Sequence, residues 1–165
     1  MTLARRLGQT WRPICGAHGL SYLRAPIRLW MRKPTLLDTD IVSELVRRNP
    51  LVSERAEAYG LAHGLLQVSV ITYYEALNGL LYRDARTQLG RLQAILSVSN
   101  LLPVTAESAA IAAQIEADLR RRGLSIGHTD TLIAGVALAN GLVLATNNTR
   151  HYERVAGLQL VNWTQ

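Results

Sequence analysis

The sequence predicts an α/β fold, in which a parallel central sheet carries helices on both of its faces. Short apolar runs of strand length alternate with longer stretches in which apolar residues recur every three or four positions. This alternation is typical of parallel sheets, because a crossover helix must connect each strand to the next. A chain of 165 residues is also long enough to bury the core of a single domain.

The individual elements follow from these periodicities and from the residues that end them. Apolar runs predict strands at residues 34–37, 65–71, 101–104, 142–146 and 158–163. Helical spacing predicts helices at residues 40–48, 50–63, 84–96, 105–122 and 129–140, and another that carries Tyr74, Leu77, Leu80 and Leu81. Thr105 is expected to cap the long helix and Gly123 to end it. Residues 147–154 are expected to form a loop and a short turn.

The apolar residues of segment 1–30 recur with neither the helical nor the strand period. We therefore place the domain at residues 31–165, after an N-terminal extension. The extension is rich in arginine and contains no acid, which is the composition of a transit peptide or of an arm that binds nucleic acid. A third interpretation, which we favour, is upstream sequence joined to a domain that begins at Met31. In each case we expect the extension to be poorly structured.

The positive charge of the chain is concentrated at its N-terminal end. Residues 1–33 contain seven lysines and arginines and no acid, whereas residues 34–165 contain eleven basic and twelve acidic residues. The formal charge of +6 is therefore no argument for a nucleic-acid partner of the domain. The single Cys15 excludes an internal disulfide and a cysteine zinc site, and no apolar run reaches the length of a membrane span.

Acidic residues stand at or near the ends of predicted strands and helices. Asp38 follows the first strand, Glu75 lies just past the second, and Asp130 begins the helix that leads to the fourth. Strand ends of a parallel sheet share one edge, so these side chains can converge there. Two carboxylates about 4 Å apart repel by roughly 4 kcal/mol at an effective dielectric constant of 20, so three need a proton or a cation. Oxygen ligands alone favour Mg²⁺ or Mn²⁺ over zinc.

Each of these acids also has a purely structural interpretation. Asp38 and Asp40 are good helix-capping residues. Thr72 and Glu75 have the spacing of a capping box, and Asp130 suits the first turn of a helix. A capping residue can also bind a metal, so the two interpretations do not exclude one another.

Four segments together resemble the PIN domain of the VapC toxin family. They are LLDTDIVSEL, SVITYYEAL, IGHTDTLIAGVALANGLVLATNN and GLQLVNW, which occur in the family's order within residues 31–165. The resemblance implies a cytoplasmic bacterial endoribonuclease that depends on Mg²⁺ or Mn²⁺, the toxin half of a type II toxin–antitoxin pair. It implies metal ligation by Asp38 and Asp130, with Glu75 as a further acid and Thr146 as a polar pocket residue. Asn148 stands where many PIN domains have a fourth acid.

The chain departs from the family pattern at three positions. Asn148 carries no charge, which favours one metal ion over two. His128 stands where the family often has proline, and His151 where some members have an acid. We expect His151 to be solvated.

The resemblance also implies three partners, namely an RNA substrate, a cognate antitoxin and a second copy of the chain. We expect a basic antitoxin side chain to enter the acidic pocket and to compete with the metal. Arginines could hold RNA phosphates, although each is also explained as a solvated helix-end charge: Arg47, Arg48, Arg120, Arg121, Arg122, Arg150 and Arg154. Apolar residues of the early helices could form partner surfaces or core: Leu61, Leu65, Leu66, Tyr73, Tyr74 and Tyr82.

Two other functions fit parts of the sequence. Residues 38–42 (DTDIV) resemble the first motif of haloacid-dehalogenase-type phosphatases, but the single Lys33 lies upstream of that motif and Asp130 has no acidic neighbour. A PIN scaffold that only binds its ligand is the other alternative, because Asn148 is uncharged. Dinucleotide binding is excluded by the lack of a GxGxxG motif after any strand.

Overall fold

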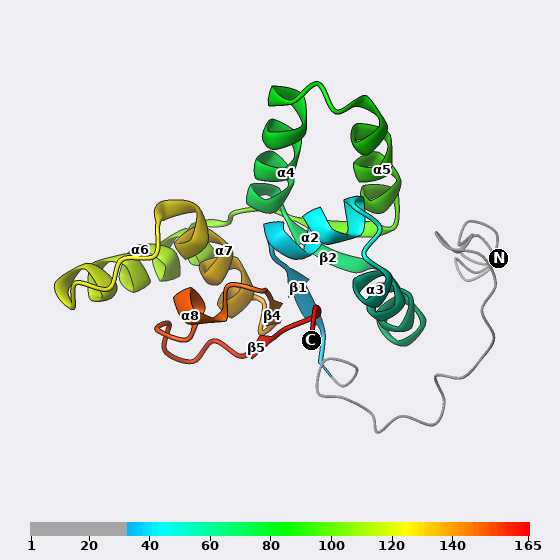
Figure 1. Cartoon of the computed structure of the whole chain (residues 1–165). Coiled ribbons are helices and arrows are strands. Elements are labelled where there is room, and N and C mark those ends of the chain that lie inside the picture. The colour runs from blue at the N-terminus through cyan, green and yellow to red at the C-terminus, as the bar shows by residue number, and fades with distance from the viewer. Residues whose placement is uncertain (1–32) are drawn as a thin grey trace.

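A computed structural model describes residues 33–165 of the chain, so the predictions for residues 1–30 lie outside the described part. Five parallel strands form one sheet in the order β3-β2-β1-β4-β5 (Figure 1). The strands are β1 (Thr35–Leu37), β2 (Leu66–Ser69), β3 (Ser99–Leu102), β4 (Val143–Ala145) and β5 (Leu160–Val161). The predicted α/β class with a parallel sheet is confirmed.

Seven described helices surround this sheet. They are α2 (Thr39–Val46), α3 (Pro50–His63), α4 (Val70–Tyr82), α5 (Arg86–Ser97), α6 (Ala106–Arg121), α7 (His128–Ala139) and α8 (Thr149–Tyr152). Among residues 33–165, no helix is long and apolar enough to cross a membrane.

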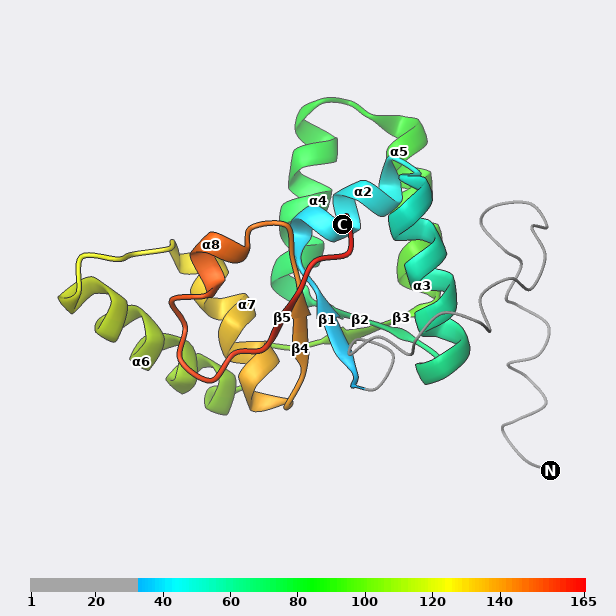
Figure 2. The same ribbon diagram turned by 60° about the horizontal axis from the view of Figure 1, so that its bottom comes forward.

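The helices divide between the two faces of the sheet, as Figures 1 and 2 show. Helices α2 to α5 cover one face, where Leu37 and Ala145 point into an apolar core with them. Helices α6 to α8 cover the other face, where Leu36 and Leu144 belong to a second core. Because neighbouring residues of one strand point to opposite faces, β1 and β4 each contribute to both cores.

The topology brings the carboxyl ends of β1, β2 and β4 to one place. Leu37 at the end of β1 pairs with Val68 of β2 and with Ala145 of β4. The strand order reverses between β1 and β4, since the chain first builds the sheet toward β3 and then returns to the other side. Ligands of open α/β sheets bind in the crevice at such a switch point.

Two predicted boundaries near the site are wrong. The strand predicted at residues 65–71 ends at Ser69, whose hydroxyl accepts the Thr72 amide at 2.9 Å and so caps α4. The capping box that we considered for Thr72 and Glu75 is therefore absent, because both residues lie inside the helix. The strand predicted at residues 101–104 lies at Ser99–Leu102 instead. Pro103 follows it and has no N–H for the ladder.

Candidate active site

Asp38 stands at the switch point, between the end of β1 and the start of α2. Its Oδ1 atom accepts the Thr39 amide at 2.8 Å, so the residue does cap the helix, as the structural interpretation proposed. Its other oxygen, Oδ2, accepts the Thr146 hydroxyl at 2.8 Å. The side chain is buried, with 6% of its surface exposed. Asp38 is therefore both a cap and a fixed, desolvated carboxylate.

Thr146 connects Asp38 to the loop that follows β4. Its hydroxyl accepts the Asn148 amide at 3.0 Å while it donates to Asp38. The neighbouring Asn147 amide donates to Oδ2 of Asp40 at 2.7 Å. Asp40 thus belongs to the acidic group, although the sequence indicated only a capping role for it. Its Oδ1 atom is buried and has no hydrogen-bond partner among residues 33–165.

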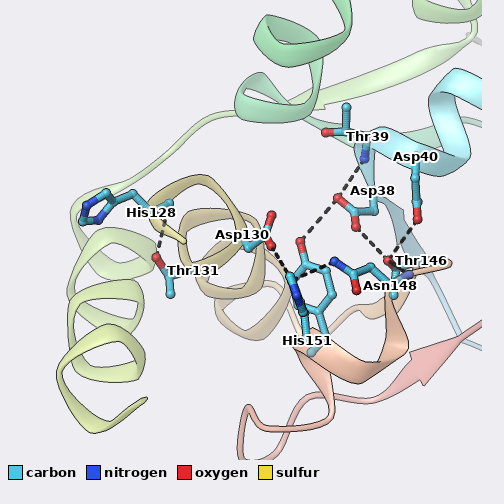
Figure 3. Close-up of polar contacts among 10 residues, drawn as sticks. Asp38, Thr39, Asp40, His128, Asp130, Thr131, Thr146, Asn148 and His151 are labelled. Atoms are coloured by element: carbon cyan, nitrogen blue, oxygen red, sulfur yellow. Dashed lines mark hydrogen bonds and ion pairs between the residues drawn. The ribbon is translucent and has the colours of Figure 1, made fainter. Parts of the chain in front are cut away.

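Asp130 and Glu75 approach the same edge from two other helices. Asp130 lies in the first turn of α7, and its Oδ2 atom is 3.4 Å from Nδ1 of His151. Glu75 lies on α4 and accepts the Thr39 hydroxyl at 2.5 Å through Oε2. The acids predicted at separate strand ends therefore gather at one edge of the sheet. Figure 3 shows Asp38, Asp40 and Asp130 around the residues of the loop after β4.

His151 is less free than we expected. Its side chain is 44% exposed, yet Nδ1 lies 2.8 Å from Nδ2 of Asn148 and close to Asp130 (Figure 3). An amide and an imidazole thus occupy the place of further acids. His128, by contrast, is an exposed residue at the start of α7 and pairs with Glu116 at 2.8 Å.

Tyr152 is a site residue that the sequence analysis missed. Its ring is fully buried in the second core, and its hydroxyl donates to Oδ1 of Asp38 at 3.4 Å. Burial raises the pKa of Asp130, and a hydrogen bond from the same Tyr152 side chain offsets part of that rise. Burial strongly raises the pKa of Tyr152, and the nearby negative charges add to this. The only signal in the sequence was an aromatic residue within a predicted turn, four positions after Asn148.

Burial raises the pKa values of the three aspartates at this edge. Burial, and then the charge of Asp40, raise the pKa of Asp38 to about 7, against the hydrogen bonds from Thr146 and Thr39. Burial also raises the pKa of Asp40 and of Asp130, and the charge of Glu75 adds to the effect on Asp130. Among the described residues, no lysine or arginine pairs with any of these carboxylates. The edge therefore carries uncompensated negative charge.

The carboxylate oxygens of the site suit a hard divalent cation that keeps some of its coordinating water molecules. Among residues 33–165, no three histidine, cysteine or acidic side chains are arranged to hold one ion by themselves. Mg²⁺ is usually held by only one or two carboxylates and completes its shell with water and phosphate oxygens. The unpartnered oxygen of Asp40 and the raised pKa of Asp38 are what such an ion would compensate.

The predicted arginines have different surroundings. Arg120, Arg121 and Arg122 at the end of α6 pair with Glu116 and Asp118, which supports their interpretation as helix-end charges. Arg47 pairs with Glu44 at 2.8 Å. None of these arginines contacts the acids of the site.

The family model of the PIN domain matches residues 35–158. The chain belongs to the PIN-domain family. This PIN domain is 33% identical over 134 residues to the tRNA(fMet)-specific endonuclease VapC of Shigella flexneri, a match that covers 78% of this chain and 97% of that protein. It is also 33% identical over 129 residues to the ribonuclease VapC2 of Haemophilus influenzae, which covers 78% and 96% of the two chains. The resemblance to the VapC family is thereby confirmed.

Solved structures give the same picture of this PIN domain. VapBC2 from Rickettsia felis, bound to a DNA fragment from its promoter, matches with a TM-score of 0.72 and 25% identity over 78% of this chain and 98% of that one. DNA-bound VapBC from Salmonella typhimurium matches with a TM-score of 0.71 and 29% identity over 79% and 98%. Both relatives are VapC proteins in complexes with VapB.

Proposed function

We propose that this PIN domain is the toxin of a type II toxin–antitoxin pair and cleaves RNA by metal-assisted hydrolysis of a phosphodiester bond. The observation that carries the proposal is the group of uncompensated carboxylates at the switch point of the sheet. It is supported by the names of the VapC relatives, which are an endonuclease and a ribonuclease.

In this proposal each residue of the site has a separate role. Asp38 and Asp130 hold Mg²⁺ or Mn²⁺, with Glu75 as a further acid. When bound, the ion supplies a water of lowered pKa and stabilises the leaving oxygen. Thr146 fixes Asp38 through its hydroxyl, and Thr39 fixes Glu75. Asn148 carries no charge and contacts His151, which favours a single ion.

The test measures ion binding and RNA cleavage separately. Mn²⁺ is expected to raise the melting temperature of the wild-type chain, and Asp38→Asn and Asp130→Asn to remove that increase. Cleavage of bulk transfer RNA is expected to fall about a thousandfold in both variants, since a metal ion contributes several kcal/mol to the transition state and each 1.36 kcal/mol is tenfold. Asp118→Asn is the matched control, because Asp118 pairs with arginines on α6, remote from the site.

A cleavage activity that persists in chelator, or in Asp38→Asn, contradicts the proposal. The binding-module alternative predicts no response to Mn²⁺ even in the wild-type chain. The phosphatase alternative lacks its basic residue at the site. Lys33 precedes β1, at the opposite end of that strand from Asp38, and donates to Gln159.

The protein partners are an antitoxin, supported by the VapBC complexes, and a second copy of the chain. Leu66 and Tyr73 of the predicted partner surfaces pack in the core, whereas four others are exposed: Leu61, Leu65, Tyr74 and Tyr82. Tyr74 and Leu81 lie seven residues apart on α4 and so share one face of it. We expect light scattering to show a dimer that Leu81→Asp dissociates; an unchanged mass excludes this face.

A further inference from the structure

A cavity of about 150 Å³ lies between α2, α4 and α5, and Glu75 is the acid of the candidate site that lines it. Thr39, Ser43 and Arg47 line it from α2, and Glu75, Gly79 and Arg83 line it from α4. Each set has the spacing i, i+4, i+8, which places its members along one stripe of a helix. The cavity is therefore a passage between two facing stripes.

Both stripes lead away from the site. Helices α2 and α4 each begin at the end of a strand, and these strands are parallel neighbours. The Thr39 hydroxyl bonds Glu75 at one end of the passage. Arg47 and Arg83 stand at the other end, where each is the C-cap of its helix. Eight residues at 1.5 Å per residue place the arginines about 12 Å from the acidic end.

Arg83 is the cation whose donors remain available. Arg47 is already paired with Glu44, whereas Arg83 has no carboxylate partner in the described part of the chain. The Nε atom of Arg83 donates to the Gly79 carbonyl at 2.9 Å, which fixes the side chain along α4. A Cβ atom at Gly79 would lie 3.9 Å from Nη2 of Arg83, in ordinary van der Waals contact, so this position faces the guanidinium. A cation interacts favourably with a helix C-terminus, which explains why an arginine stands at this position. It does not explain why a cavity leads from Glu75 to that arginine.

We propose that this passage is the subsite for the nucleotide next to the scissile phosphate of the RNA, with Arg83 holding the adjoining phosphate. The inference rests on the proposed function, because Glu75, at one end of the passage, is the acid through which the passage adjoins the site proposed for the ion and the scissile phosphate. A guanidinium binds phosphate oxygens through two parallel hydrogen bonds. Ser43 and Gln88, which also line the passage, offer hydrogen bonds to the sugar and base between its two ends. The lining combines these polar side chains with Val46, Ala76 and Leu80 and has a cationic end, which suits a nucleotide better than an apolar peptide side chain.

The experiment compares Arg83→Gln with Arg86→Gln in the full chain. Arg86 is exposed, pairs with Asp84, and does not line the passage, so it is a matched control three residues away. Arg83→Gln is expected to raise the KM for a single-stranded RNA substrate about tenfold and to leave kcat within about twofold, because one charge-assisted phosphate contact is lost in both ground and transition states. The slope of log kcat/KM against log salt is expected to fall by about 0.7, the value for one phosphate contact to a single strand.

A second variant reduces the space in the passage without removing the charge of Arg83. Ser43→Leu fills the passage from α2 and leaves the charges in place, so it is expected to raise KM without altering the salt slope. Leucine is also a better helix former than serine, so the change does not weaken helix α2 itself. Circular dichroism melting of each variant verifies the fold.

The outcomes distinguish this subsite from the proposed function. If Arg83→Gln behaves like Arg86→Gln in KM and salt slope, the RNA subsite is wrong and the passage is open to a protein partner instead. If Arg83→Gln lowers kcat alone, Arg83 acts on the chemistry and the assignment is also wrong. If the wild-type chain cleaves no RNA, the proposed function fails. In that case, fluorescence anisotropy of a labelled single-stranded RNA with Mg²⁺ still decides whether Arg83, and not Arg86, contributes to binding.

Discussion

Three hydrogen-bond donors surround the Asp38 carboxylate, yet its pKa is raised. The Thr39 amide and the hydroxyls of Thr146 and Tyr152 all donate to it. Donors of this kind ordinarily stabilise the charged form and lower the pKa. Burial and the charges of Asp40 and Asp130 outweigh them and bring the value to about 7. The residue is thus positioned by its donors and is left in need of a positive charge.

This balance predicts how stability depends on pH when no metal is bound. Between about pH 4 and pH 7 the native state binds the Asp38 proton more tightly than the unfolded state, so the free energy of unfolding falls as the pH rises. The loss is up to about 4 kcal/mol at 1.36 kcal/mol per pKa unit. Asp38→Asn lacks this proton and is expected to gain stability over the wild type as the pH rises through that window. Urea unfolding in chelator at several pH values measures the difference, and a constant difference contradicts the prediction.

The Tyr152 hydroxyl predicts a separate effect on ion binding. Tyr152→Phe keeps the buried ring and removes only the donor to Asp38, so the free energy of unfolding is expected to change by no more than about 1.5 kcal/mol. Mn²⁺ affinity, measured by calorimetry, is expected to fall about tenfold or more, the usual cost of losing a group that orients a metal ligand. Tyr82→Phe is the control, because Tyr82 is 91% exposed. Equal Mn²⁺ affinities in the two variants would assign Tyr152 to packing alone.

Residues differ in how far the sequence can place them. Asp38 was predictable because it directly follows an apolar strand, and strand ends share an edge in a parallel sheet. The contributions of Asp40 and Tyr152 to the site could not be predicted in this way. Asp40 turns toward the site because the Asn147 amide, far away in the sequence, donates to it. Tyr152 is positioned by the second core, and neither contact leaves a local pattern in the sequence.

At the scale of elements, boundaries depend on competing caps. The apolar run after residue 65 predicts a strand through Ile71, because branched residues favour strands. Ser69 ends the strand early, since its hydroxyl accepts the Thr72 amide in the first turn of α4. The shift matters for function, because it places Glu75 in the second turn of the helix, within reach of Thr39. Alternation of elements was therefore predictable, whereas the turn on which an acid lies was not.

The contact between α6 and α7 gives a prediction about two glycines. A Cβ atom at Gly135 of α7 would lie 2.4 Å from the Ser108 carbonyl oxygen and 2.9 Å from the Cβ atom of Ala112, both on α6. Gly135→Ala is therefore expected to lower the free energy of unfolding by about 1–3 kcal/mol, because the helices must separate. Gly90→Ala on α5 meets nothing within 4 Å and is expected to raise it by about 0.5–1 kcal/mol. Urea unfolding measures both, and effects of the same sign would contradict this account.

At the scale of the whole described molecule, the C-terminal segment connects the two cores. Leu158 and Leu160 pack against the core under α6 to α8, whereas Trp163 is buried in the core under α2 to α5. The parallel α/β class followed from alternation alone, and so did a final strand. The path of the chain across the sheet edge after β5 could not be predicted from the sequence. It depends on the strand order β1-β4-β5, which no local pattern encodes.

This crossing also reaches the candidate active site. The Trp163 ring is fully buried with its centroid 5.8 Å from that of Tyr59, and Arg55 on α3 donates to the Asn162 carbonyl at 2.8 Å. The next residue, Thr164, donates through its hydroxyl to the side chain of Asn147, whose amide holds Asp40. The packing of one indole is thereby coupled to the position of one acid.

Trp163→Ala tests this coupling. Loss of a fully buried tryptophan is expected to lower the free energy of unfolding by about 3–5 kcal/mol. Because Thr164 then loses its anchor, Mn²⁺ is also expected to stabilise the variant less than the wild type under conditions where both are folded. Thr164→Val removes the hydroxyl contacts to the side chains of Asn147 and Asn162 and is expected to weaken the Mn²⁺ response with a much smaller loss of stability. Gln93→Ala, on the exposed face of α5, is expected to change neither the Mn²⁺ response nor the stability. A full Mn²⁺ response in folded Trp163→Ala and in Thr164→Val would show that the segment closes the core without positioning the site.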